Sequence, residues 1–299
     1  MKKDAFKDYL NELKHFLCKS LFYGVMCLPD SYFETLFQRV YPIYKALHRN
    51  RAYGRVVKHL KNAAAHHPSR QLKQVSPRAV FRGIFWNAID SYRGLANFHS
   101  VSSRVVFENK EIIREALKQG PIAAISIHQG SFELLHRSLC RFSNNVHLVT
   151  DTLGNGEIRK IIQELRSNPC LTEYSPEESR ALIRNLFKTQ GILAMVFDQG
   201  KHTKGNKVTL FGQDSTLYLR LPQLVNQMGA GIVTFRTFTK GNHRGKIVIR
   251  FEKYYPPKYD PIKQKSDANL VESIAKEVET WIAEHPSEWS WNYHGNFRA

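Results

Sequence analysis

Between residues 105 and 284, short apolar runs alternate with longer segments whose apolar residues recur at helical spacing. The short runs are typical of buried strands, and the longer segments of amphipathic helices. We expect strands at Val105–Phe107, Ile122–Ile127, Val146–Val149, Ile192–Phe197, Ile232–Thr237 and Ile247–Phe251. We expect helices at Lys110–Lys118, Phe132–Phe142, Asn155–Arg166, Pro176–Lys188, Leu217–Met228 and Ala268–Glu284. This alternation predicts an α/β fold in which helices flank one mixed sheet.

The segment ISIHQGSFE, residues 125–133, places a histidine and a glutamate on either side of a turn. The expected strand ends just before His128, Gln129 and Gly130 form a turn, and a helix begins near Ser131. On one regular helix the two side chains would lie roughly 140° apart, so they need the turn to cooperate. In the first helical turn the dipole favours an ionised Glu133, which could fix the tautomer of His128 and stabilise its imidazolium. The alternative is a loop histidine followed by a capping acid.

Two polar residues, His128 and Asp198, follow directly on expected strands. Ligands of α/β proteins usually bind at the carboxyl ends of strands, so both residues are candidates for a site. A histidine there can act as general base on a hydroxyl that attacks an activated acyl carbon. An aspartate at a strand end can equally be structural.

The segment HQGSFE resembles the H-x4-D/E motif of the lysophospholipid acyltransferase superfamily, in the form found in the late lauroyl and myristoyl acyltransferases of lipid A biosynthesis. Further segments resemble that family in the same order, from about Phe107 to the C-terminus. They are the lead-in Phe107–Lys110 with Glu115–Gly120, the arginine-bearing segment Glu164–Asn168, the D-Q block Phe197–Gly200, the turn Leu210–Gly212 and the tail Pro286–His294. The resemblance implies a glycerolphosphate-acyltransferase-like fold.

The resemblance also implies roles for individual residues. His128 would act as general base, oriented by Glu133, while the acceptor hydroxyl attacks a thioester. Arg166, Asp198 and Gln199 would bind substrate, with the Arg166 guanidinium holding a phosphate or stabilising developing charge. The alternative for this arginine is an ordinary surface position at a helix end. The loop from residue 201 to 207 would be a basic lid or a hairpin loop.

The donor implied is an acyl carrier protein or acyl-CoA, and the acceptor is a hydroxyl of lipid A or a lipid A precursor. Late lipid A acyltransferases commonly have an aromatic-asparagine-tryptophan core in the first motif and a basic tail. This chain departs from both, at Gln129–Phe132 and at His294–Arg298. Because of these departures, a second reading stays open: aminoacyl (glycyl) transfer from a carrier protein to lipid A, which would alter outer-membrane charge and cationic peptide resistance. A third reading is a non-catalytic lipid-binding protein.

The chain carries 44 Lys and Arg against 26 Asp and Glu, a formal charge of +18 with a pI near 9.8. Such an excess favours polyanionic partners. The sequence contains no nucleic-acid-binding motif, so anionic membrane surfaces, phosphorylated glycolipids and acidic carrier proteins are the better candidates. The cations form an early cluster (Arg49, Arg51, Arg55, Lys58, Lys61) and a late one (Arg236, Lys240, Arg244, Lys246, Arg250, Lys253), each of which could instead be a solvated face.

The N-terminal segment has the pattern of a basic amphipathic helix. Its apolar residues recur at helical spacing with lysines between them: Phe6, Leu10, Leu13, Phe16, Leu17 and Leu21. No apolar run approaches the about 18 residues of a spanning helix, and no signal peptide is evident. We therefore expect residues 1–60 to be a helical, membrane-associating region, residues 61–299 to be the α/β acyltransferase domain, and the protein to lie peripherally on the cytoplasmic face of the bacterial inner membrane. The alternative is a helix packed on the protein's own core.

The four cysteines, Cys18, Cys27, Cys140 and Cys170, have no zinc-site or C-x-x-C spacing. We expect reduced thiols in a cytoplasmic protein. The remaining histidines are scattered, and the chain has neither a P-loop nor a dinucleotide-binding fingerprint. We therefore expect no metal and no cofactor.

Overall fold

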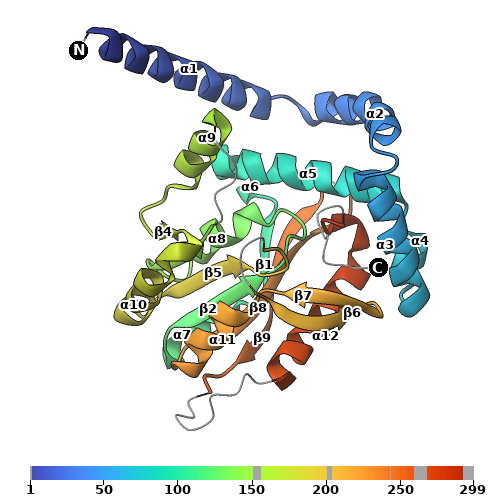
Figure 1. Ribbon diagram of the computed structural model, residues 1–299, viewed down its shortest axis with the longest axis vertical. Helices are drawn as coiled ribbons and strands as arrows, with labels where there is room; N and C mark the ends of the chain where they lie inside the picture. The colour runs from blue at the N-terminus through green and yellow to red at the C-terminus, as the bar shows by residue number, and fades with distance from the viewer. Residues whose placement is uncertain (1, 151–155, 201–203, 243, 259–267, 292–299) are drawn as a thin grey trace.

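The computed structural model describes residues 2–150, 156–200, 204–242, 244–258 and 268–291, with side chains described from residue 12 onward in the first helix. A seven-stranded sheet forms its centre (Figure 1), in the order β1-β9-β8-β2-β5-β3-β4. The strands are β1 (Val105–Glu108), β2 (Ile122–Ser126), β3 (Val146–Val149), β4 (Leu171–Tyr174), β5 (Ile192–Val196), β8 (Gly231–Lys240) and β9 (Lys246–Tyr255). Neighbouring strands are parallel except for the β8 and β9 pair, so the expected mixed sheet is confirmed.

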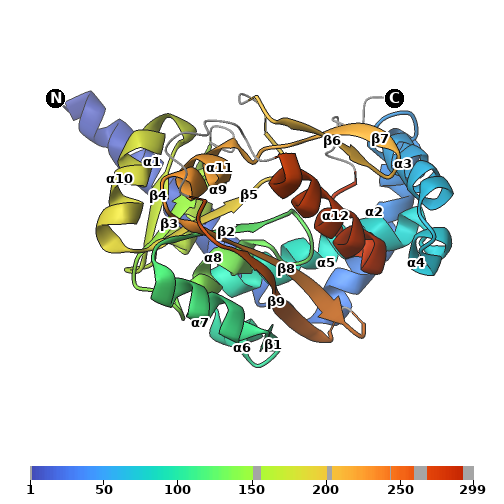
Figure 2. The ribbon, with the colours of Figure 1, turned by 90° about the horizontal axis from the view of Figure 1, so that it is seen from below.

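Helices cover both faces of this sheet (Figure 2). α7 (Lys110–Gln119) and α8 (Glu133–Leu139) pack on one face, and α10 (Ser179–Thr189), α11 (Arg220–Gln227) and α12 (Ala268–Glu284) pack on the other. The central strand β2 is completely buried between them, with Ile122 and Ile125 at 0 % exposure. Each such side chain contributes about 1.5–3 kcal/mol by leaving water. The ends of β2 are therefore held rigidly.

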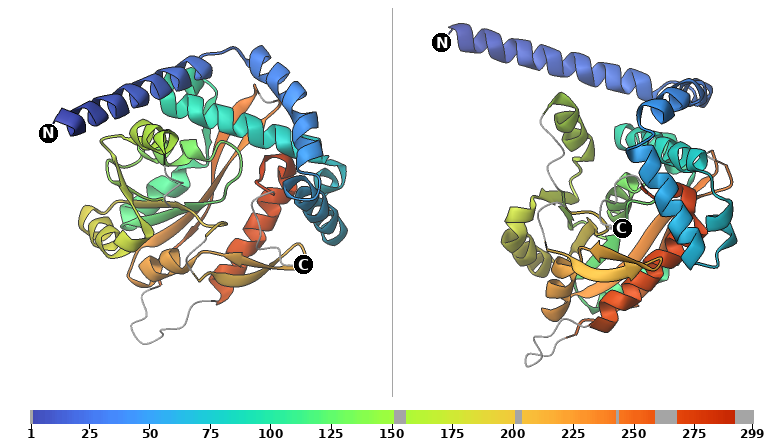
Figure 3. Two further views of the ribbon diagram at one scale, coloured as in Figure 1. Left: turned by 45° about the horizontal axis from the view of Figure 1, so that its top comes forward. Right: turned by 45° about the vertical axis from the view of Figure 1, so that its right-hand side comes forward.

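The N-terminal part of the chain is helical and continues beyond the expected limit at residue 60. It consists of α1 (Lys2–Met26), α2 (Asp30–Leu47), α3 (Ala52–His66), α4 (Arg70–Gln74), α5 (Pro77–Ala96) and α6 (His99–Ser102). α5 passes across the sheet, with α1 and α2 lying over it and α3 descending along one side (Figure 1, Figure 3). The sheet begins only at Val105, after all six helices.

Two structures were not expected from the sequence pattern. One is the edge strand β4, and the other is a hairpin formed by β6 (Asn206–Leu210) and β7 (Gln213–Leu217). Phe211 and Gly212 form the two-residue turn, both with positive φ (51° and 71°), which is the geometry that favours tight hairpins. The Phe211 ring is buried and lies 6.0 Å from the ring of Trp291, which fixes the hairpin to the C-terminal segment.

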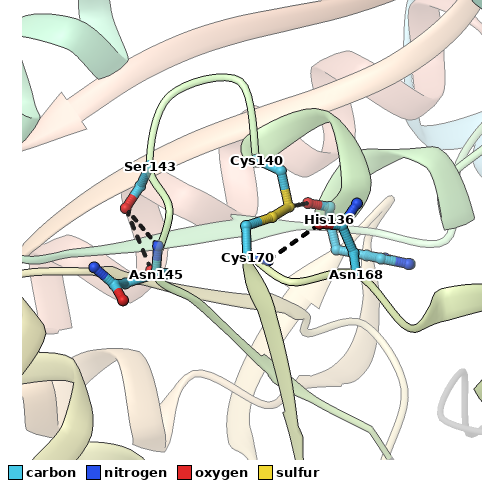
Figure 4. Close-up of a disulfide and its surroundings, with 6 residues drawn as sticks. All are labelled: His136, Cys140, Ser143, Asn145, Asn168 and Cys170. Carbon is cyan, nitrogen blue, oxygen red and sulfur yellow. Dashed lines mark hydrogen bonds between the residues drawn. A yellow bond between two sulfur atoms is a disulfide. The ribbon is translucent and has the colours of Figure 1, made fainter.

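The expectation of four reduced thiols is wrong for one pair, because Cys140 and Cys170 form a disulfide (Figure 4). Cys140 follows α8 and Cys170 precedes β4, and their Cα atoms lie 5.9 Å apart. Their separation of 30 residues gave no signal, since it is the sheet that brings the end of α8 beside the start of β4. Cys18 and Cys27 are free thiols.

The late basic cluster is a solvated face only in part, since Lys240, Arg244, Lys246 and Lys253 are exposed. Arg236 is only 2 % exposed and pairs with Glu252 and Glu284. Arg250 and Lys240 share Glu108. Four of the six cations, Arg236, Lys240, Arg244 and Arg250, thus form salt bridges with acids of the protein itself.

Candidate active site

The register between β2 and β5 brings His128 and Asp198 together. Ser126 pairs with Val196 across these parallel strands. His128 follows Ser126 by two positions, and Asp198 follows Val196 by two positions. The two side chains therefore emerge at the same edge of the sheet. The Nδ1 atom of His128 lies 2.6 Å from Oδ1 of Asp198, and the backbone N–H of His128 donates to the same oxygen at 3.1 Å.

The C-terminal segment completes this arrangement. The indole Nε1–H of Trp289 donates to Oδ2 of Asp198 at 3.0 Å. Trp289 also forms an isolated β-bridge with Gln129, and the Gly130 N–H donates to the carbonyl of Glu288 at 3.0 Å. Trp289 and Asp198 are almost fully buried, at 1 % and 2 % exposure. The contacts of the Asp198 carboxylate are therefore made with the protein rather than with bulk water.

The contact with Asp198 fixes how His128 carries its proton. A carboxylate oxygen accepts hydrogen bonds, so Nδ1 is the protonated ring nitrogen and Nε2 keeps its lone pair. The His128 side chain is 19 % exposed, so its ring is reachable from outside. The ring centroid also lies 4.6 Å from that of Phe132, edge to face. A histidine oriented by a buried carboxylate has the arrangement of a general base.

We expected Glu133 to orient His128, but the structure gives that contact to Asp198. Glu133 instead accepts two hydrogen bonds from Arg166, from Nε at 3.0 Å and from Nη2 at 2.6 Å. The physical reason is that Glu133 begins α8 and lies beside the end of α9 (Glu157–Arg166). The carboxyl at the end of β5 reaches the imidazole directly because its strand is the hydrogen-bonded neighbour of β2.

The Glu133 and Arg166 pair is buried and ionised. Burial acts to raise the pKa of Glu133, but the Arg166 guanidinium outweighs it and holds that pKa below its usual range. Arg166 is 9 % exposed, so it is not the surface arginine of the alternative reading. Two of its N–H groups already serve Glu133, and the charge of Glu173 also acts on it. Its cation is largely matched within the protein.

His136 is a neighbour of this pair that the sequence reading did not select. Its Nε2 lies 4.0 Å from Oε2 of Glu133, one helical turn away on α8. Burial lowers the pKa of His136 to about 4, so the imidazole is neutral at physiological pH. At physiological pH, Arg166 is therefore the charged partner of Glu133, and the neutral His136 is not.

The turn between His128 and α8 depends on Gly130. Its φ of +59° lies in the left-handed region, and a Cβ there would approach the carbonyl oxygen of Thr237 to 2.5 Å. Glycine alone satisfies both conditions without strain. Close contact with β8 therefore determines where the loop carrying His128 lies.

The remaining expected residues are less engaged. Gln199 is half-buried beside Asp198, and the structure gives its side chain no hydrogen bond to another described residue. The expected basic lid includes Lys201–Thr203, which lie outside the described residues, and β6 already begins at Asn206. No group of three potential metal ligands occurs among the described side chains.

Residues 2–298 match the sequence profile of the bacterial lipid A biosynthesis acyltransferase family. Among solved structures, the chain is similar to the 1-acyl-sn-glycerophosphate acyltransferase PlsC from Thermotoga maritima, with 16 % identity, a TM-score of 0.36, and coverage of 71 % of this chain and 88 % of that one. No curated protein sequence matches the chain.

Proposed function

Because the chain belongs to the bacterial lipid A biosynthesis acyltransferase family and is therefore an acyltransferase, we propose that it moves an acyl group from a thioester donor to a hydroxyl of lipid A or a lipid A precursor. The observation that carries this proposal is the contact between His128 and Asp198 at the carboxyl end of β2 and β5. A base with a free Nε2 is what deprotonation of an acceptor hydroxyl requires.

In the proposed reaction, Nε2 of His128 takes the proton of the acceptor hydroxyl as its oxygen attacks the thioester carbonyl. The tetrahedral oxyanion then collapses and the carbon–sulfur bond breaks. The imidazolium of His128 gives its proton to the leaving thiolate, which restores the neutral base. Asp198 accepts from Nδ1–H throughout and stabilises the imidazolium that forms between the two steps. Each proton and electron pair is thus accounted for without another reactant.

Glu133 has a supporting role in this proposal. Its charge and that of His128 act on each other, because the histidine contributes to the lowered pKa of Glu133. Arg166 ensures that the carboxylate stays ionised although it is buried.

The proposal is tested by the mass of lipid A from cells with and without the protein. We expect a mass gain equal to a long acyl chain, and no gain in cells carrying His128→Ala. A gain equal to a single glycine would support aminoacyl transfer instead. An unchanged gain in the His128→Ala cells would remove the enzymatic role of this residue and leave the lipid-binding reading.

We also propose that α1 and α2 hold the protein on the cytoplasmic face of the inner membrane. No described helix is long and apolar enough to cross a bilayer. On α1, Cys18 and Phe22 pack towards α5 and α9, while the opposite face is exposed. The exposed apolar residues of the two helices are Leu13, Phe16, Leu17, Leu21, Tyr23, Tyr32, Leu36, Val40, Ile43 and Leu47.

These ten residues are most of the fourteen large apolar side chains that are exposed in the described structure. On α2 they recur three or four positions apart and form a stripe next to the one that Phe33 and Phe37 bury. Phe6 and Leu10 were expected on the same surface, but the structure does not describe their side chains. A surface of this kind is typical of helices that lie in the headgroup region.

Sedimentation with vesicles tests this second proposal. The full chain should sediment with vesicles that contain anionic lipid, and replacing Leu17, Leu21, Val40 and Ile43 with Ser should release it. Substitutions at these exposed positions leave the core intact, so circular dichroism should be unchanged. If the substituted protein sediments as well as the original, this surface is not the membrane contact.

A further inference from the structure

One surface carries charge that the protein does not balance. From Thr35 to Ile89 the chain contains 11 Lys and Arg and no Asp or Glu. Seven of these cations lie on α3, on α4 or at the start of α3, and we call them the basic face: Arg49, Arg51, Arg55, Lys58, Lys61, Arg70 and Lys73. All seven side chains are exposed. Within the described residues, none of them takes part in a salt bridge.

The helix α3 presents this charge in one row. Arg51, Arg55 and Lys58 are spaced four and three residues apart, so they lie on one side of the helix. The other side carries Val56, Leu60 and other residues buried against the domain. Like charges at this spacing repel one another, so the row costs stability unless a partner uses it. In the late cluster, four of the six cations form salt bridges with acids of the protein, whereas none of the basic face does so within the described residues, and this contrast supports a binding role for the basic face.

The direction of α3 argues against a membrane as the partner. α3 leads away from the layer formed by α1 and α2 and runs down the side of the molecule (Figure 1, Figure 3). Its 15 residues extend over about 22 Å at helical rise. The potential of an anionic lipid surface falls off within a Debye length of about 8 Å. With α1 and α2 on the membrane, the far half of the basic face would meet water.

The size of the face argues for a protein rather than a single nucleotide-like donor. Seven cations spread along α3 and α4 are more than the few phosphates of a nucleotide-like donor can pair with, whereas a protein partner, which buries about 800 Å² in an ordinary interface, can contact several of them at once. A partner of matching charge would be a small acidic protein. In a reaction that consumes a thioester, a carrier protein that delivers the acyl chain fits this chemistry.

The inner side of α3 is linked to the proposed catalytic residues. Nδ1 of His59 lies 3.2 Å from the carbonyl oxygen of Trp291. The Trp291 ring lies 4.7 Å from that of Trp289, whose indole N–H holds Asp198. The helix that presents the cations therefore also packs on the segment that supports Asp198. A donor bound on its outer side would lie next to the catalytic part of the molecule.

We propose that the basic face of α3 and α4 docks the acidic carrier protein that delivers the acyl thioester. The inference rests on the proposed thioester chemistry for the role of the partner, whereas the binding surface itself can be tested without turnover. Electrostatic docking of this kind acts mainly on encounter and on apparent affinity. It leaves the chemical step at His128 unchanged.

The test uses two double variants. One combines Arg55→Glu and Lys58→Glu on α3, and the matched control combines Arg184→Glu and Lys188→Glu on the exposed side of α10. Both variants change the net charge equally. Binding of purified, unloaded acyl carrier protein is measured by fluorescence anisotropy at low and physiological salt. We expect the α3 variant to weaken binding about tenfold or more at low salt and the α10 variant to change it less than about twofold.

Turnover is then measured with two donors, lauroyl-loaded carrier protein and lauroyl-CoA. The α3 variant should raise the half-saturating concentration of the carrier-linked donor about tenfold, with kcat unchanged and lauroyl-CoA turnover unaffected. The inference is overturned if the two variants bind the carrier protein equally well. It is also overturned if the α3 variant loses binding to anionic vesicles but keeps binding to the carrier protein. If neither donor supports transfer by the original protein, the proposed function fails, whatever the carrier binds.

Discussion

The Asp198→Asn substitution examines the proposed base most directly. Both carboxylate oxygens of Asp198 accept hydrogen bonds: one from His128, the other from Trp289. An asparagine of the same shape has one accepting oxygen and one donating amide group. If the oxygen keeps Trp289, the amide faces Nδ1 of His128, which must then accept. The ring proton moves to Nε2, and the base is lost.

The opposite orientation of the asparagine also carries a cost. The amide would then face the indole N–H of Trp289, leaving two buried donors against each other at about 1–3 kcal/mol. The first orientation sets the same amide against the backbone N–H of His128, which in the original protein donates to Asp198 at 3.1 Å. Each orientation therefore opposes two buried donors, and in both the imidazolium loses the carboxylate charge that stabilises it. The corresponding change in a serine protease triad lowers kcat about 10⁴-fold, which at 1.36 kcal/mol per factor of ten is about 5 kcal/mol of transition-state stabilisation.

The assay is the initial rate of acyl transfer from a thioester donor to a lipid A acceptor. We expect Asp198→Asn to lower kcat by about 10³-fold or more, with a smaller change in KM and an unchanged circular dichroism spectrum. Trp289→Phe is the companion variant, since it removes one donor from Asp198 and leaves the tautomer intact; we expect a loss of roughly tenfold. A folded Asp198→Asn protein with more than a tenth of the original kcat would refute the reasoning.

Three further predictions concern stability. Arg166→Met leaves Glu133 buried without its cation and should lower the free energy of unfolding by about 3–5 kcal/mol, measured by urea titration. Adding Glu133→Gln to the Arg166→Met protein should recover part of this loss. If it recovers nothing, the ion-pair argument is contradicted. Burial raises the pKa of Glu288 to about 7, although the backbone N–H of Thr239 on β8 partly offsets this effect. Below about pH 4.5 the folded and the unfolded protein both hold this proton, and above that pH the unfolded protein loses it first. The free energy of unfolding should therefore fall as the pH rises from about 4.5 to about 7. Glu288→Gln should remove that loss, about 1–3 kcal/mol between pH 5 and 8; equal pH dependence in both proteins would exclude this cause. Gly130→Ala should lower the melting temperature and transfer activity together, because its Cβ meets Thr237 and its φ is positive; a fully stable, active variant would show that the loop can move aside.

The sequence predicted the sheet well, because each strand of the α/β core is a short apolar run between helices. The polar hairpin strands β6 and β7 and the short edge strand β4 lack that signal. His128 and Asp198 were both selected as candidates because they follow strands, but the contact expected between His128 and Glu133 is made by Asp198 instead. That assignment depends on which strand lies next to β2, and an alternating pattern does not determine strand order.

Charge was harder to predict than fold. The early and late basic clusters look alike in the sequence, and only the structure separates them. Arg236 lies on a buried strand with two carboxylates near it, whereas Arg55 lies on the outer side of α3, within the stretch from Thr35 to Ile89 that contains no acid. The disulfide between Cys140 and Cys170 was missed for a similar reason, since tertiary proximity leaves no trace in cysteine spacing.

The bond from Trp289 to Asp198 also bears on the order of events during synthesis. The ribosome produces His128 and Asp198 long before Trp289, and N-terminal parts of a chain can begin to fold first. Until the segment around Trp289 has left the exit tunnel, Asp198 lacks its indole partner and Gln129 and Gly130 lack their contacts with the tail. A nascent or prematurely terminated chain would therefore hold the pair of His128 and Asp198 less firmly than the finished protein, because one of the hydrogen bonds that orient Asp198 is still missing.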